Sequence, residues 1–442
     1  MHRFVEARTT DPQRRGAVLF RPGEKPEGDF LGKLRLAKMA CIVDCSRRAI
    51  SLRIKTMLFL IFALFPALAA AQTYTYSTLV SFPPNSQMGP ANPAGQLIID
   101  GQGNLYGTSQ GGGIYAPPFG DGTIFEVTPA GVVTVLHSFD GTDGRMPVYK
   151  LTRDPQGNLY GTTVAGGTYD LGTVFKLAPD GTETVLYNFP GKGPDGNYPN
   201  YSVTLDPAGN LYGYTSFADN NFISNGGSIF KLTPQGTFSL LYEFCNLRSS
   251  CPNGYGPEGG LLRDKSGNFF GATCCYGGSE GAGTVFKMTP QGKLTVLTTF
   301  NLFGGGVISP NGPFVQNAGG DLIGVANAVY KVTRTGSVSP LYFFCNSPSC
   351  GGNGGGYSPN GLLTIDSSGN VYGTTLNGGT NDQGVAYEVT PAGTEIVLYN
   401  GSPTTPLGPS VVIDKAGNLY GVTDQGGVNS TGSIYKLTKN AD

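Results

Sequence analysis

Three short phrases recur in fixed order along most of this chain, and the repetition limits its fold more than any other feature. The first phrase, Asp-x-x-Gly-Asn-Leu-Tyr-Gly, recurs at steps of 48 to 58 residues. Its asparagine position is filled by Asn104, Asn158, Asn210, Asn268, Asn370 and Asn418, and by Asp321 in a degraded copy. A unit of this length cannot bury its apolar faces alone, so the repeats must stack on one another.

The second phrase, Thr-Val-Phe-Lys-Leu-Thr-Pro-x-Gly, has an aromatic residue at its centre in every copy. These residues are Phe125, Phe175, Phe230, Phe286, Tyr330, Tyr387 and Tyr435. The third phrase, Val-Leu-Tyr-x-Phe, ends at Phe139, Phe189, Phe244, Phe300 and Phe344, and survives in part at residues 397–399. Each repeat therefore predicts four short antiparallel strands, as in one β-propeller blade, and the central aromatic residues predict a packing layer between blades.

The two ends of the repeat region complement each other. The last repeat stops at residues 436–438 without a fourth strand, whereas residues 78–82 resemble a strand that no repeat contains. Pairing these ends would remove the exposed edges and close the ring. We therefore predict an all-β, seven-bladed β-propeller of four-stranded antiparallel blades, closed by the N- and C-terminal strands. An open β-solenoid is the alternative, but it needs capping repeats.

The N-terminal region has the pattern of a targeting sequence. Residues 57–71 are apolar, follow a basic segment at 47–55, and end in three alanines. This order is typical of a secretory signal peptide, and a retained membrane anchor is the alternative. We expect residues 1–38 to be a non-native upstream extension, residues 39–71 to be the signal peptide, and residues 72–442 to be one propeller. The mature protein is then secreted or at the cell surface.

The charge of the mature chain excludes two classes of partner. Residues 1–71 contain 13 of the 29 Lys and Arg residues but only 6 of the 30 Asp and Glu residues, which leaves a net charge of −8 after residue 71. A chain so poor in basic residues has no face that could neutralise phosphates. We therefore expect no nucleic acid partner and no binding to anionic membranes. We also expect no transmembrane segment in the mature chain, and a monomer.

Six cysteines follow the predicted signal peptide, and four of them occupy matching points in two repeats. Cys245 and Cys251 follow the third phrase of one repeat, and Cys345 and Cys350 follow that of another. In an exported chain this placement predicts two local disulfides. A zinc site is the alternative, although no His and no second CxxC accompanies these cysteines. The adjacent pair Cys274–Cys275 could form a vicinal disulfide or stay reduced.

The combined repeat resembles the GloVer (Gloeo_Verruco) tandem repeat of exported bacterial proteins. The resemblance rests on the segments 157–163, 172–176 and 185–189, which read Gly-Asn-Leu-Tyr-Gly-Thr-Thr, Gly-Thr-Val-Phe-Lys and Val-Leu-Tyr-Asn-Phe. It covers residues 78–438, and it is specific because three phrases keep their order. The resemblance implies a secreted or surface-displayed propeller-like protein of unassigned activity.

The two sides of such a ring differ in their connections. One side carries short, uniform turns that begin with an aspartate. We interpret this aspartate as a hydrogen-bond acceptor within the turn and the following glycine as its positive-φ residue. Calcium binding is the alternative, but it needs six or more oxygens. The turn aspartates are Asp100, Asp154, Asp206, Asp264, Asp366 and Asp414.

The opposite side carries the long, variable loops, where ligand contacts usually lie. An acidic residue accompanies Gly-Gly in six of the seven loops between second and third strands. These residues are Asp121, Asp170, Asp219, Glu280, Asp382 and Asp424. A ring of carboxylates could bind calcium or a polyol, and a merely solvated polar loop is the alternative. We take the six residues as the candidate ligand-binding set and predict no other metal site and no cofactor.

Few residues in the sequence could support catalysis. His137 is the one histidine after the predicted signal peptide, and it replaces the tyrosine of other third phrases, so we interpret it as a packing residue. The chain contains no P-loop or HExxH motif. We therefore expect a binding or interaction module for an extracellular glycan or protein. The alternatives are a polysaccharide- or lactone-active hydrolase or lyase that uses loop carboxylates, and a purely structural repeat.

Overall fold

The computed structural model describes most of the chain after residue 73. The described residues are 74–84, 89–114, 120–191, 196, 198–199, 201–215, 226–244, 251–275, 281–301, 307, 310–344, 355–405, 407–423 and 426–440. All described residues belong to one compact unit, residues 70–442. Nothing in these ranges forms a helix long and apolar enough to span a membrane.

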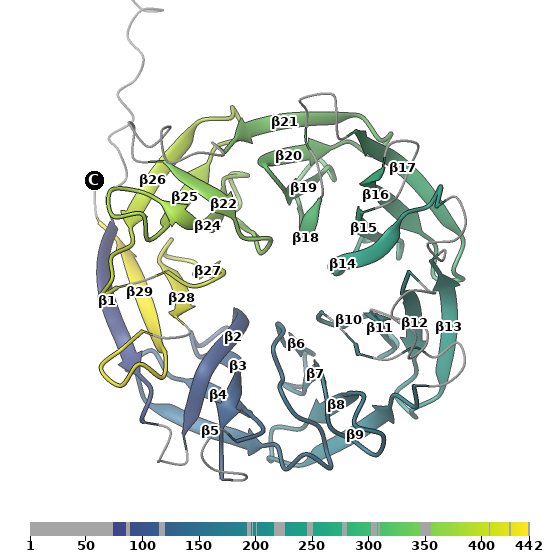
Figure 1. The fold of residues 1–442 in the computed structure, drawn as a ribbon, viewed down its shortest axis with the longest axis horizontal. Helices are drawn as coiled ribbons and strands as arrows, with labels where there is room; N and C mark the ends of the chain where they lie inside the picture. Colours follow the sequence, from purple (N-terminus) through teal and green to yellow (C-terminus); the bar gives the residue numbers. More distant parts are fainter. Residues whose placement is uncertain are drawn as a thin grey trace, which may run out of the picture. The chain divides into compact units, whose positions relative to one another are not determined.

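Seven antiparallel sheets form a closed ring of blades (Figure 1). The predicted seven-bladed β-propeller is therefore confirmed. Blade 1 is β2(Pro90–Ile99), β3(Leu105–Gly112), β4(Thr123–Val127), β5(Val133–Ser138); blade 2 is β6(Thr152–Arg153), β7(Leu159–Thr163), β8(Thr173–Leu177), β9(Glu183–Asn188). Blade 3 is β10(Thr204–Leu205), β11(Leu211–Thr215), β12(Ser228–Leu232), β13(Phe238–Glu243); blade 4 is β14(Tyr255–Arg263), β15(Phe269–Cys275), β16(Gly281–Met288), β17(Leu294–Asn301).

The remaining three blades follow the same order around the ring. Blade 5 is β18(Asn311–Gln316), β19(Leu322–Val325), β20(Ala328–Val332), β21(Val338–Phe343). Blade 6 is β22(Gly356–Pro359), β23(Thr364–Ile365), β24(Val371–Gly378), β25(Val385–Val389), β26(Glu395–Asn400), and blade 7 is β27(Val411–Ile413), β28(Leu419–Thr423), β29(Ser433–Lys439) with β1(Tyr74–Ser81). The first strand of a blade lies nearest the centre, and the fourth strand lies on the outer rim (Figure 1).

The seventh blade joins the two ends of the repeat region, as predicted. Strand β1 pairs antiparallel with β29, with Tyr76 opposite Leu437 and Ser81 opposite Ser433. The following Phe82 is fully buried, and its ring packs edge-on against Phe125 of blade 1 at a centroid distance of 5.2 Å. The strand begins at Tyr74, four residues before the predicted start. The N-terminal strand therefore completes blade 7 and also contributes to the core between blades 7 and 1.

The innermost strands approach one another so closely that side chains are excluded at two points. A Cβ on Gly259 would lie 1.9 Å from the carbonyl carbon of Gly312, and a Cβ on Gly312 would lie 1.8 Å from the oxygen of Gly361. Pairing in β14 and β18 shifts register at these glycines, and in blade 6 the first strand is interrupted outright between β22 and β23. Blade 6 therefore has five strands, where the repeat predicts four.

In each blade, a glycine of the second strand leaves space for an aromatic ring of the third strand. The Gly of the first phrase, on the second strand of a blade, pairs with the aromatic residue of the second phrase, on the third strand, for example Gly161 on β7 with Phe175 on β8. A Cβ on Gly161 would lie 2.5 Å from Cζ of Phe175, which is 0% exposed. The same pairing occurs in all seven blades: Gly107–Phe125, Gly161–Phe175, Gly213–Phe230, Gly271–Phe286, Gly324–Tyr330, Gly373–Tyr387 and Gly421–Tyr435. The aromatic layer is confirmed, and the glycine is required because the ring occupies its side-chain space.

The turn aspartates are structural, which confirms the sequence interpretation. Asp154 accepts hydrogen bonds from the backbone N–H of Asn158 at 2.8 Å, from Asn158 Nδ2 at 2.7 Å and from the Tyr160 hydroxyl at 3.1 Å. Equivalent bonds from the following asparagine occur at the other five turn aspartates. In blade 5, Asn317 takes this role and accepts from the N–H of Asp321 at 2.9 Å. These carboxylates are therefore already satisfied by the turn.

Asp154→Ala is expected to destabilise the protein by about 1–3 kcal/mol, because it leaves buried amide and hydroxyl donors without an acceptor. Burial alone would raise the pKa of Asp154, but the hydrogen bonds from Asn158 and Tyr160 outweigh it and lower the pKa. A carboxyl whose pKa is lower in the folded state stabilises the fold above its unfolded pKa and loses this effect as the pH falls through the folded value. Urea unfolding at pH 7 and pH 3 should therefore show a smaller difference between variant and wild type at pH 3. An equal difference at both values would contradict the ionised-turn account.

Candidate functional site

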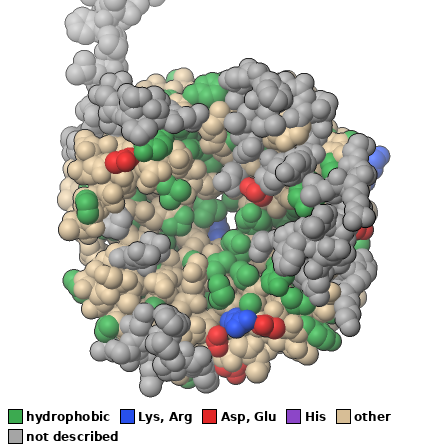
Figure 2. All heavy atoms as spheres, viewed as in Figure 1, with side chains coloured by type: hydrophobic (Ala, Val, Ile, Leu, Met, Phe, Trp, Pro, Cys, Tyr) green, Lys and Arg blue, Asp and Glu red, His purple; other side chains and the backbone are tan. Residues whose placement is uncertain are grey.

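The two faces of the ring differ in exposed apolar side chains. We call the side with connections between second and third strands and between blades the loop face, and the side with the aspartate turns the turn face. Of the seven large hydrophobic residues that are exposed among the described residues, six lie at the loop face: Ile114, Met146, Tyr169, Phe343, Leu376 and Val428. The seventh, Val132, lies in a turn between third and fourth strands. Figure 2 shows one face of the ring, with hydrophobic side chains gathered around the centre.

Two of the predicted acidic residues hold their own loops in shape. Asp170 and Asp382 both have positive φ values, of 58° and 53°. The Asp170 carboxylate accepts from the N–H of Gly166 at 2.9 Å and pairs with the Arg145 guanidinium at 2.9 Å. Asp382 accepts from the N–H of Gly378 at 2.8 Å and from the Tyr357 hydroxyl at 2.9 Å. These loops belong to blades 2 and 6, so the two carboxylates do not converge on one ligand.

The third described member, Asp121, belongs to an acidic group at the junction of blades 1 and 2. Burial raises the pKa of Asp121, the nearby Arg145 opposes the rise, and Asp143, Asp140 and Asp170 add to it. The structure therefore brings together two of the predicted residues, Asp121 and Asp170, around one arginine. The other predicted residues, Asp219, Glu280 and Asp424, lie outside the described residues. Ligand binding at the acidic loops stays a prediction.

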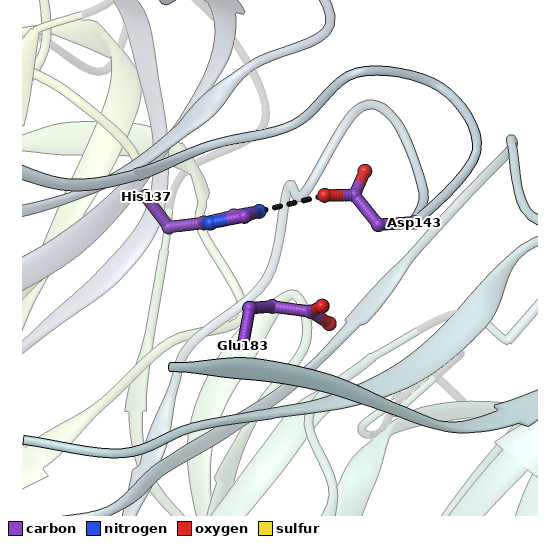
Figure 3. A group of neighbouring side chains, drawn as sticks. All are labelled: His137, Asp143 and Glu183. Atoms are coloured by element: carbon purple, nitrogen blue, oxygen red, sulfur yellow. Dashed lines mark hydrogen bonds and ion pairs between the residues drawn. The ribbon is translucent and has the colours of Figure 1, made fainter. Parts of the chain in front are cut away.

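A second group at the same junction contains the one histidine that follows the predicted signal peptide. His137 on β5, Asp143 in the connection to blade 2, and Glu183 on β9 point toward one another (Figure 3). One donor atom from each lies within 4.8 Å of those of the other two, and His137 Nε2 lies 2.8 Å from Asp143 Oδ2. The His137 ring also packs edge-on against Phe139 at 4.8 Å. The histidine packs as predicted, but its carboxylate partners come from a loop and a neighbouring blade that the repeat pattern does not connect.

A carboxyl group on the innermost strand of blade 4 has no described acidic neighbour. Burial raises the pKa of Glu258 to about 7. Two tyrosines from the first-strand regions of blades 2 and 3, Tyr149 and Tyr201, lie near it. Burial raises the pKa of both tyrosines, and the charge of Glu258 adds to the rise. Their ring centroids are 5.1 Å apart. A carboxyl that titrates near neutral pH could act as a general acid or base. Glycoside hydrolysis needs a second carboxyl at a defined separation, and none of the described residues supplies one to Glu258.

The turn face carries shallow grooves between the aspartate turns of successive blades. The groove between blades 4 and 5 has a volume of about 510 Å³ and is lined by residues that include Asp264, Lys287, Asn317 and Arg334. Similar grooves lie between blades 5 and 6 and between blades 6 and 7. Their aspartates are used in turns, so the grooves offer lysine, arginine and amide groups to a ligand.

The predicted disulfides fall largely outside the described residues. Cys251 is buried, at 8% exposed, and is disulfide-bonded. Its expected partner Cys245, and the second pair Cys345 and Cys350, are not among the residues described. Both pairings therefore stay predictions.

Comparison with known proteins identifies the repeat and confirms the ring. The Gloeobacter/Verrucomicrobia repeat family matches residues 115–328, which confirms the repeat predicted from the three phrases over that part of the chain. The extracellular domain of a protein described as a hybrid two-component system of B. thetaiotaomicron is similar in fold, with a TM-score of 0.51 and 13% identity. The match covers 83% of this chain and 41% of that one. No curated protein has a significantly similar sequence.

Two further solved structures show weaker similarity. PorZ, a surface component of the type-IX secretion system of Porphyromonas gingivalis, matches at a TM-score of 0.49 and 15% identity, over 80% of this chain and 47% of its own. A gluconolactonase of Xanthomonas campestris matches at 0.41 and 12% identity, over 85% and 93%. This chain thus spans less than half of PorZ and of the two-component protein. At such identities the likeness concerns the fold alone.

Proposed function

We propose that this chain, whose residues 115–328 carry the Gloeobacter/Verrucomicrobia repeat, is an exported module that binds an extracellular protein through its loop face. The observation that carries the proposal is the concentration of exposed large hydrophobic side chains on that face. Ile114 is 51% exposed, Leu376 is 58% exposed and Val428 is 87% exposed. Large apolar side chains exposed on one face of the ring offer contact area to a protein partner.

The chemistry of these side chains favours protein over glycan. Most of the exposed residues are aliphatic or methionine, which form the apolar centres of protein interfaces. Tyr169 is the one tyrosine among them, whereas a sugar-binding surface would present several aromatic rings and polar groups. The loops that carry these side chains are held by internal hydrogen bonds, such as those of Asp170 and Asp382, so the surface is preformed.

Export is part of the proposal and rests on the sequence. The apolar segment 57–71, preceded by the basic segment 47–55, supports a signal peptide, and the paired cysteines support an oxidising compartment. Secretion or surface display would place the loop face where it can meet proteins of the cell envelope or the surroundings. The competing hydrolase function would need two carboxyl groups that act on the substrate. Release of product from an added substrate would demonstrate it.

Replacing Ile114 and Val428 with serine should weaken binding to the natural partner at least about tenfold, because burying each side chain is worth roughly 1.5–3 kcal/mol. Val132→Ser, on the turn face, is the matched control and should leave binding unchanged. The measurement is saturable binding of fluorescently labelled protein to intact cells of the organism that encodes it.

Protease treatment of those cells should abolish the binding, whereas periodate oxidation of their glycans should not. Binding that survives protease but not periodate would assign a glycan partner and refute the protein proposal. Equal loss in Val132→Ser and in the loop-face variant would show that the surface has been misassigned. Release of reducing sugar or opened lactone from added substrates would instead support the enzyme.

A further inference from the structure

The fourth strands of successive blades follow one another around the rim, visible in Figure 1 as β5, β9, β13, β17, β21, β26 and β1. At three junctions between these strands, a tyrosine near the end of one strand contacts a side chain at the start of the next. The pairs are Tyr187 stacked on Phe238 at 4.7 Å, Tyr399 stacked on Tyr76 at 4.9 Å, and Tyr342 bonded to Glu395 Oε2 at 2.6 Å.

His137 and Glu183 occupy these same two positions at the junction of blades 1 and 2. His137 pairs with Ile124 across the sheet, as Tyr187 pairs with Val174 in the next blade. Glu183 starts its fourth strand opposite Leu177, in the register by which Glu395 lies opposite Val389. This junction thus places an imidazole and a carboxyl where other blades place an aromatic pair or a tyrosine with a glutamate. The inter-blade connection adds the carboxylate of Asp143.

We propose that His137, Asp143 and Glu183 bind a divalent transition metal ion of the zinc class at this junction. The three donor atoms lie within 4.8 Å of one another, and ligands bonded at about 2.0–2.2 Å to one ion lie roughly 3.4 Å apart, so the widest pair would close by up to about 1.4 Å. The His137 and Asp143 donors, 2.8 Å apart, would separate by about 0.6 Å to admit the ion. The His137 and Asp143 side chains are 18% and 17% exposed, which leaves access for an ion. Three protein ligands with an open position suit zinc.

The donor set discriminates among metals. One imidazole nitrogen with two carboxylate oxygens suits zinc, cobalt or nickel, whereas calcium prefers six to eight oxygens. The carboxylates cannot supply that number, and the other charged group that acts on Glu183 is Asp140. We therefore expect no comparable binding of calcium at this junction.

Glu183 has a buried carboxylate oxygen whose hydrogen-bonding capacity is unsatisfied. Its Oε1 is buried and has no hydrogen-bond partner among the described residues. His137 and Asp143, in contrast, contact each other at 2.8 Å. At the equivalent position of blade 6, Glu395 accepts the Tyr342 hydroxyl. A cation between the three groups would supply the partner that tyrosine supplies there.

The test is isothermal titration of the full-length protein with ZnCl₂ at pH 7.5, with CoCl₂ as a spectroscopic probe. We expect one equivalent of Zn²⁺ to bind, a rise in melting temperature, and cobalt absorption bands typical of nitrogen and oxygen ligands. Glu183→Gln should weaken this binding at least tenfold. Glu395→Gln, at the matching position of blade 6, is the control and should bind as the wild type does.

His137→Tyr provides a second variant in case Glu183→Gln fails to fold. This substitution recreates the tyrosine–glutamate pair of the blade 5–6 junction, so it should fold and lose the metal. Zinc bound with unchanged affinity by His137→Tyr or Glu183→Gln would overturn the site, as would wild-type protein that binds no zinc at micromolar concentrations. Equal heats with CaCl₂ and ZnCl₂ would overturn the metal class. Because the loop-face variants leave these residues intact, failure here leaves the proposed protein-binding function untouched.

Discussion

Protein that lacks residues 73–83 is expected to lose cooperative folding and to aggregate. This deletion removes β1, leaves the edge of β29 unpaired and takes away Phe82, which is fully buried against Phe125. An open edge and an exposed apolar junction both favour association between molecules. Circular dichroism melts and size-exclusion chromatography of the deleted and parent proteins measure the effect.

A synthetic peptide of residues 73–83 is the matched control for this deletion. Added in excess, it should bind the vacated edge and restore part of the melting temperature, because strand addition supplies the same backbone hydrogen bonds. The same peptide with Tyr76 and Phe82 replaced by serine should restore less. A shortened protein that melts as cooperatively and at the same temperature as its parent would show that the ring is not closed by β1.

Phe175→Ala is expected to lower the free energy of unfolding by about 3–5 kcal/mol, as is usual for a fully buried phenylalanine. The ring of Phe175 is 0% exposed, packs against Phe139 at a centroid distance of 5.2 Å, and fills the space above Gly161. Its loss leaves a cavity between blades 1 and 2, where Leu151 and Leu159 belong to the same apolar cluster. Urea unfolding followed by fluorescence or circular dichroism measures the change.

The glycine opposite this ring gives the reciprocal experiment. Gly161→Ala should cost about 1–3 kcal/mol through overcrowding, since its Cβ would lie 2.5 Å from the ring of Phe175. Combined with Phe175→Leu, the alanine should cost less than it does alone, because the smaller side chain vacates the crowded space. Strict additivity of the two substitutions would show that the glycine is needed for another reason.

The fold could be predicted from the sequence because every blade repeats the same structural residues. Equivalents of Asp154, Gly161 and Phe175 recur in the same order in each repeat, and each residue type has a local physical role that can be recognised without coordinates. The unattached strand before the first repeat then indicated how the ring closes. The break between β22 and β23 could not be predicted, because it arises from the approach of inner strands in neighbouring blades rather than from any single repeat.

The candidate sites were harder to predict for the same reason. Asp121 and Asp170 come from comparable loops, yet it is Arg145, from the connection between their blades, that lies between them. His137 and Glu183 belong to different repeats, and their contact depends on how outer strands meet around the rim. The one sequence signal for this contact was His137 itself, which replaces tyrosine in the first copy of the third phrase. It identified an unusual position but did not reveal its partners.

The joining of β1 to β29 also sets an order of events for the making of this protein. The Ser77 hydroxyl bonds to the carbonyl of Lys436, a partner 359 residues away, so the earliest strand has no pairing partner until the latest strand has been made. Contacts so distant along a chain slow folding. The polypeptide therefore cannot close its ring until its final residues have been made.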